Sequence, residues 1–149
     1  GADAAGFTDN GHRLVVAHCL IADSDDEARA MARRYLSEFF LLQRRHYESD
    51  SQPWTNIKGY EQFNKYFGNL IALSDPANID KFSDHNMIGS PATVARQVEK
   101  LRDIGFNHIM VHPATVGVPR QVRHDTLKRF AAEVAPAFSE VFKAPTAAQ

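Results

Sequence analysis

Hydrophobic positions are most regular between residues 86 and 117, where the pattern predicts one strand–helix–strand unit. Ser90 supplies a hydroxyl for the N-cap of the helix, and Pro91 stands at the first helical position, where its missing N–H costs nothing. Gly105 suits a left-handed C-terminal cap, and residues 106–112 are apolar enough for a second, buried strand. Two strands joined by a helix of this length should be parallel, with a right-handed crossover. The helix is indicated by apolar residues three or four positions apart: Val94, Val98, Leu101 and Ile104.

An earlier strand–helix pair precedes this unit. Residues 13–22 form a nearly continuous apolar run of strand length, which is typical of a strand covered on both faces. Ser24 and Glu27 have the spacing of a capping box, so a helix should begin at Asp25. Acidic residues occupy its first turn, which the helix dipole favours. One side of this helix is apolar: Ala28, Met31, Ala32, Tyr35, Leu36, Phe39 and Leu42.

The segment 47–85 is too long for a plain loop and should be a structured insertion, with a helix within residues 59–73. Its aromatic residues allow two interpretations. The rings can hold the insertion against the body of the protein or against a partner subunit. Alternatively, Trp54, Tyr60 and Phe63 line an apolar substrate cavity, because long insertions often act as lids. The sequence leaves both interpretations open.

A last helix follows Pro119, and Pro136 should kink or end it; the tail 143–149 lacks periodicity and should be frayed. The element order is therefore strand, helix, insertion, strand, helix, strand, helix. Three β–α steps in one domain, 1–149, predict an α/β fold with a parallel sheet. A closed eight-stranded barrel needs about 250 residues, so this chain can form only part of one.

Composition excludes several classes. A net charge of −1 gives no basic surface for nucleic acid or an anionic membrane, and no apolar run approaches the roughly 20 residues that span a bilayer. Cys19 is the only cysteine, so an internal disulfide is impossible and a reducing cytoplasm is expected. Because Cys19 lies within an apolar strand pattern, we expect a buried small side chain and not a nucleophile.

Four segments together resemble the C-terminal part of bacterial-luciferase-like flavin-dependent monooxygenases, in the same order and spacing. They are ADSDDEAR at 22–29, IGSPATV at 88–94, GFNHI at 105–109 and FAAEVAP at 130–136. Within that family the chain looks most like the limonene and diketocamphane monooxygenases. The resemblance implies the last three β–α units of a (β/α)8 TIM barrel, with the helical insertion before the penultimate strand.

The same resemblance implies an activity. Such enzymes use reduced FMN from a separate flavin reductase, or in one branch the deazaflavin F420, and oxygenate a small organic substrate with O2. The N-terminal strands that supply most flavin contacts in the family are absent from this sequence, and residues 1–11 carry no initiator methionine. We therefore expect a C-terminal portion of a longer enzyme, inactive alone, that assembles with the missing N-terminal part or with a second copy. The alternative is a non-catalytic α/β module that covers its sheet edges by homo-oligomerisation.

Candidate site residues follow from the strand ends, because a parallel barrel has its active face at the carboxyl ends of its strands. Gly89 and Ser90 lead into a helix N-terminus, whose amides can bind the phosphate of a cofactor or can simply be capped. His108, Met110 and His112 share one strand face. If the opposite face of this strand packs against the helices, His112 lies at the active end of the barrel. There it can donate a proton or contact the flavin, and the alternative is a purely structural histidine. His18 lies mid-strand and is expected in the core.

No metal site is expected. The seven histidines include no H-x-x-x-H on a helix, and His108 and His112 are too far apart along a strand to share an ion. The chain also lacks a G-x-S-x-G elbow, a P-loop and a dinucleotide fingerprint, so hydrolase and kinase functions have no support.

Overall fold

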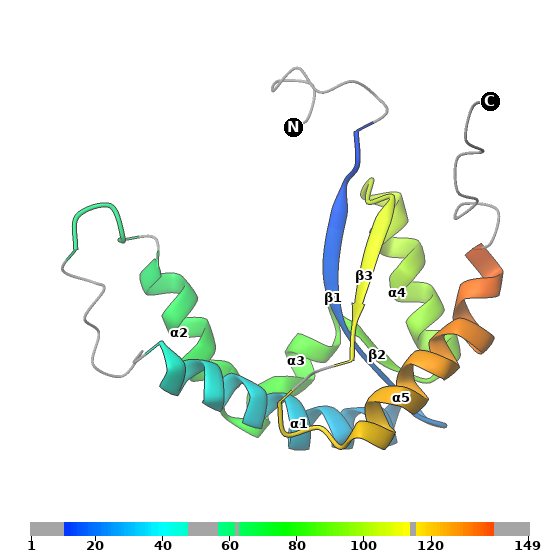
Figure 1. Cartoon of the computed structure of the whole chain (residues 1–149), viewed down its shortest axis with the longest axis horizontal. Coiled ribbons are helices and arrows are strands. Elements are labelled where there is room, and N and C mark those ends of the chain that lie inside the picture. The colour runs from blue at the N-terminus through cyan, green and yellow to red at the C-terminus, as the bar shows by residue number, and fades with distance from the viewer. Residues whose placement is uncertain (1–10, 48–56, 62, 114–115, 139–149) are drawn as a thin grey trace.

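The computed structural model describes residues 11–47, 57–61, 63–113 and 116–138. Trp54 and the tail 143–149 lie outside these residues. The described chain contains three strands, β1 (Leu14–Ile21), β2 (Met87–Gly89) and β3 (His108–His112). Its α-helices are α1 (Asp25–His46), α2 (Phe63–Leu73), α3 (Ile79–Ser83), α4 (Pro91–Asp103) and α5 (Arg120–Arg129), as Figure 1 shows.

The strands form one parallel sheet in the order β2-β1-β3. The α/β fold with a parallel sheet is therefore confirmed. Consecutive strands of a closed (β/α)8 barrel pair with one another, whereas in the described chain β3 pairs with β1. The eight residues of β1 offer β3 a longer edge than the three residues of β2, and five residue pairs form along it, from Leu14 with His108 to His18 with His112.

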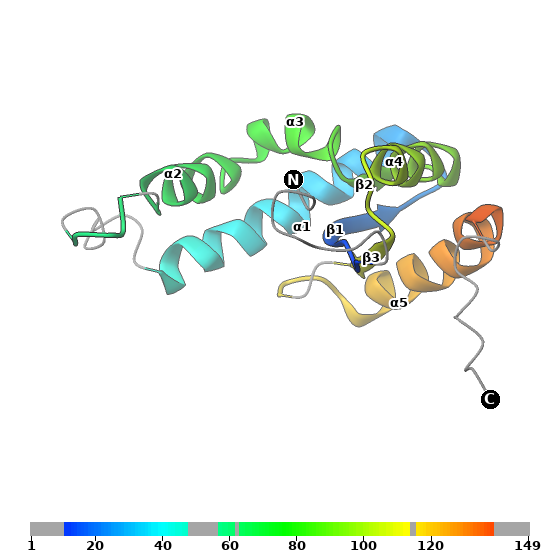
Figure 2. The same cartoon turned by 90° about the horizontal axis from the view of Figure 1, so that it is seen from above.

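Helices lie on both faces of this sheet (Figure 2). The chain moves along the sheet in one direction from β1 to β2 and in the opposite direction from β2 to β3. Because both crossovers have the same hand, α1 and α4 lie on opposite faces of the sheet. Alternate β1 residues enter two separate cores. Leu20 packs with residues of α1, α2 and α3, whereas Cys19 and Ile21 pack with Val94 and Val98 of α4 and with Val134 beyond α5.

The sheet is covered less completely than expected. β1 is buried on both faces only towards its carboxyl end, since Leu14 and Val16 are 53% and 54% exposed. β3 was expected to be buried, and this was wrong: Met110 is 52% exposed and His108 is exposed as well. β3 is an edge strand, and in Figure 1 the amino-terminal half of both strands extends beyond α1.

Local signals in the sequence place the helix ends correctly. Ser24 Oγ accepts the Glu27 N–H at 3.2 Å and caps α1 at Asp25, as the capping box predicted. Ser90 caps α4, Pro91 opens it, and Gly105 follows it with φ +102°, the left-handed conformation that glycine favours. After α5 the chain continues through a π-helical turn, 130–134, and a 3-10 turn, 135–138, that contains Pro136.

The expected helix in the insertion is present as α2. Phe67 and Leu70 of α2 are buried in the core that α1 forms, so the insertion is held against the body of the protein. α2 lies beside the carboxyl-terminal end of α1, the end away from the sheet (Figure 1). Within the described residues no helix is both long and apolar enough to cross a membrane.

Candidate functional site

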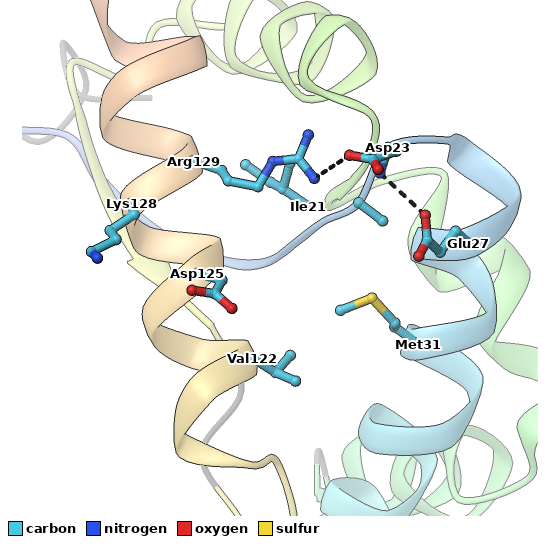
Figure 3. A pocket seen from close by; sticks show the side chains of 9 residues that line it. Ile21, Asp23, Glu27, Met31, Val122, Asp125, Lys128 and Arg129 are labelled. Atoms are coloured by element: carbon cyan, nitrogen blue, oxygen red, sulfur yellow. Dashed lines mark hydrogen bonds and ion pairs between the residues drawn. The ribbon is translucent and has the colours of Figure 1, made fainter.

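A cavity of about 470 Å³ opens at the carboxyl end of β1, between α1 and α5 (Figure 3). This volume lies in the range of small-molecule sites. Met31 and Val122 point towards one another across it from the two helices. Apolar atoms therefore form its inner surface, and charged groups stand around it. The lining residues are Ile21, Ala22, Asp23, Glu27, Met31, Val122, Asp125, Lys128 and Arg129.

Asp23 joins the two helices at one end of this cavity. Its backbone N–H donates to Glu27 Oε2 at 3.3 Å, and its carboxylate forms an ion pair with Arg129 at 3.0 Å. Arg129 also donates to both carboxylate oxygens of Glu133, at 2.8 and 3.2 Å. This bond to Glu133 is the main cause that raises the pKa of Arg129 and lowers the pKa of Glu133. Arg129 of α5 thus pairs with two carboxylates, one of which, Asp23, follows β1.

The remaining charged residues of the lining are Glu27, Asp125 and Lys128, so the rim carries both signs of charge. Asp125 accepts a hydrogen bond from Gln121 at 2.8 Å, and the Lys128 side chain points away from α1 in Figure 3. An apolar inner surface with charged groups at its rim suits a small, mainly apolar organic molecule.

Gly89 and Ser90 lie at a helix start that holds an anion of the chain itself. The Ser90 N–H donates to Asp25 Oδ1 at 2.7 Å, and the Thr93 hydroxyl donates to Asp25 Oδ2 at 2.8 Å. The backbone bond from Ser90, followed by the bond from Thr93, lowers the pKa of Asp25. A Cβ at position 89 would stand 2.8 Å from Asp25 Oδ1, so glycine allows the carboxylate to approach. The groups considered for a cofactor phosphate therefore bind Asp25 in this structure.

His112 lies in a different place, opposite His18 across the β1–β3 pairing. The two Nδ1 atoms are 3.2 Å apart, and the ring centroids are 4.8 Å apart. Burial, and then the charge on His112, lower the pKa of His18 to about 4; burial also lowers the pKa of His112. Three phenylalanine rings stand within 6 Å of the His18 ring, those of Phe39, Phe40 and Phe82.

The other sequence candidates lie apart from the cavity. Tyr60 and Phe63 stack on one another with centroids 5.3 Å apart, are 41% and 36% exposed, and do not line it. Cys19 is fully buried, as expected, and burial raises the pKa of its thiol to about 12. No group of three or more metal-binding side chains occurs within the described chain.

The structure thus does not bring His112, Ser90 and Tyr60 together, and it adds cavity residues that the sequence did not single out. Glu27 was assigned to the capping box and Met31 to a helix core, and nothing local marks Asp125. Their common feature is the contact between α1 and α5, which the hydrophobic pattern does not specify. Comparison with protein-family models and with curated proteins finds no match for this chain.

Proposed function

We propose that the chain is the C-terminal portion of a flavin-dependent, luciferase-like monooxygenase that oxygenates a small organic substrate with reduced flavin and O2. The observation that carries the proposal is the position of the cavity. Three of its lining residues, Ala22, Asp23 and Glu27, belong to the first of the four segments that resemble this family. The cavity also opens at the carboxyl end of a parallel strand, where α/β enzymes bind their ligands.

In this proposal the chain supplies a wall of the substrate site. Ile21, Met31 and Val122 provide the apolar surface for the carbon skeleton of the substrate. The enzyme works in the cytoplasm with a flavin reductase as its source of reduced FMN.

The described residues do not fit the FMN phosphate. The amide of Ser90 binds Asp25, and Arg129 is paired with Asp23 and Glu133. The phosphate would therefore be held by another part of the enzyme. The proposal also includes a (β/α)8 barrel for the whole enzyme, of which this chain would supply the last three β–α units.

The full gene product and the 149-residue chain both test the proposal. The reading frame should continue upstream of Gly1 and encode the missing strands. The full-length product of that frame, supplied with reduced FMN and ¹⁸O2, should add one ¹⁸O atom to a terpene or cyclic ketone. The 149-residue chain alone should bind such a ketone weakly, with amide NMR shifts at Met31 and Val122, and should bind FMN weakly or not at all. An in-frame stop codon directly upstream of Gly1, or tight stoichiometric FMN binding by the chain alone, would contradict the proposal.

A second candidate function is self-association without catalysis. It is favoured by an apolar patch on the sheet, formed by Leu14, Val16 and Met110, in which Val16 and Met110 are paired across β1 and β3. Each of these side chains is more than half exposed. A homodimer at micromolar concentration that Met110→Lys converts to a monomer, measured by light scattering, supports this candidate. A wild-type monomer that binds no hydrophobic dye rejects it.

A further inference from the structure

We propose that His18 and His112 bind a divalent transition-metal ion through their Nδ1 atoms. The proposal does not depend on the flavin chemistry above. It comes from the pairing of β1 with β3, which sets the two histidines side by side although 94 positions separate them in the sequence.

The distance between the two nitrogens suits a shared ion. Zinc binds imidazole nitrogen at about 2.0–2.1 Å, so two ligands at a tetrahedral angle have their nitrogens about 3.4 Å apart. The Nδ1 atoms of His18 and His112 are 3.2 Å apart. An ion would replace the hydrogen bond between them, and each ring would then carry its proton on Nε2.

The surroundings favour this exchange. The hydrogen bond between the two Nδ1 atoms requires that at least one of them be unprotonated, and an unprotonated ring nitrogen is the form that binds metal. The His18 backbone N–H donates to Asn86 Oδ1 at 3.2 Å, and the Phe39 and Phe82 rings confine its side chain, so the pair is positioned before an ion arrives. Within the described residues neither imidazole has a hydrogen bond or an ion pair with a carboxylate, so the ligand set is imidazole with water.

This ligand set selects the ion. Imidazole suits Zn²⁺, Ni²⁺ and Cu²⁺, whereas Mg²⁺ and Ca²⁺ require oxygen ligands. Since His112 is only half-buried, water can reach the remaining coordination positions. The site has two protein ligands and open positions, so we expect reversible binding and not a permanent structural ion.

The test is a Zn²⁺ titration of the full chain, prepared free of metal, with long-range ¹H–¹⁵N spectra of the histidine rings. We expect one equivalent of Zn²⁺ to shift Nδ1 of His18 and His112 and to raise Tm. His112→Asn should weaken the affinity at least about tenfold, since even the loss of an outer partner of a metal ligand costs 10–100-fold. His18→Asn should weaken the affinity for Zn²⁺ by a similar factor. If His18→Asn unfolds the chain by circular dichroism, His112→Asn alone decides between binding and no binding at this pair.

Two controls separate this pair from the other histidines. His124→Asn changes an exposed histidine of α5 and should leave the affinity unchanged. His12 and His108 form a second close pair, with ring centroids 4.6 Å apart, at the exposed end of the sheet. Loss of Zn²⁺ binding in His108→Asn but not in His112→Asn would overturn the proposal, as would the absence of a shift at Nδ1 in the unaltered chain.

Discussion

The carboxylate of Asp25, in the first turn of α1, accepts the backbone N–H of Ser90 at 2.7 Å, although 65 positions separate the two residues. The same carboxylate accepts the Thr93 hydroxyl, and Arg96 donates to that hydroxyl oxygen at 2.6 Å. A negative charge at the start of α4 also suits the helix dipole. Asp25 therefore connects the carboxyl ends of β1 and β2, which are adjacent strands of the sheet.

Replacement of Asp25 should destabilise the fold. Asp25→Ala removes two hydrogen bonds to a charged acceptor, and we expect the free energy of unfolding to fall by about 1–3 kcal/mol. The matched control is Asp26→Ala, since Asp26 is an exposed residue in the same helical turn. Urea titrations of the two variants at pH 7 measure the difference, and equal losses in both would contradict the role of Asp25.

The lowered pKa of Asp25 also predicts a dependence on pH. Because the carboxylate is favoured in the folded state, its stabilisation is present above the unfolded pKa of about 3.9 and is lost as the pH falls through the folded value. The stability difference between wild type and Asp25→Ala should therefore narrow in acid.

A methyl group at position 89 should be poorly tolerated. The Cβ of Gly89→Ala would stand 2.7 Å from Thr93 Cγ2 and 2.8 Å from Asp25 Oδ1, so the contact between Asp25 and α4 must open. We expect a loss of about 1–3 kcal/mol in unfolding free energy. Gly68→Ala is the control: its Cβ meets nothing within 4 Å, and in a helix alanine is favoured over glycine by about 0.5–1 kcal/mol. Thermal unfolding of the two variants should give Tm changes of opposite sign.

The His18 imidazole should make the fold sensitive to mild acid. Its folded pKa of about 4 is below the ordinary value of 6.5, so between these two values the unfolded state binds more protons. Stability should therefore fall by roughly 1–3 kcal/mol as the pH decreases from 6.5 to 4. Urea titrations with a chelator present measure this change. His18→Gln should remove most of it, whereas His124→Gln should retain it; an unchanged slope in His18→Gln would refute the assignment.

The buried hydroxyl group of Thr126 destabilises the folded state. Its side chain is fully buried in α5, and its hydroxyl has no hydrogen-bond partner within the described chain. Thr126→Val keeps the shape and removes the unpaired polar group, so we expect a gain of about 1 kcal/mol. Thr126→Ser keeps the hydroxyl and loses a methyl group, so we expect a loss of about 1 kcal/mol. Chemical denaturation measures both, and a destabilised valine variant would show that the hydroxyl is paired.

The sequence by itself determined the order of the strands and of most helices, and the starts of α1 and α4. Ser24, Ser90 and Gly105 act on backbone groups a few positions away, and helical or strand periodicity is a property of neighbouring residues. For the same reason the burial of Cys19 could be predicted from its apolar strand. The α/β class followed from the order of these elements.

Only the tertiary structure decided which elements meet. The pairing of β3 with β1 places His112 opposite His18, and the same α1 helix brings Asp25 to Ser90 and Met31 to Val122. These contacts join residues tens of positions apart, and they depend on strand register and on which face each crossover covers. A hydrophobic pattern states that a strand face is apolar but not which partner covers it, so the histidine pair and the cavity could be found only in three dimensions.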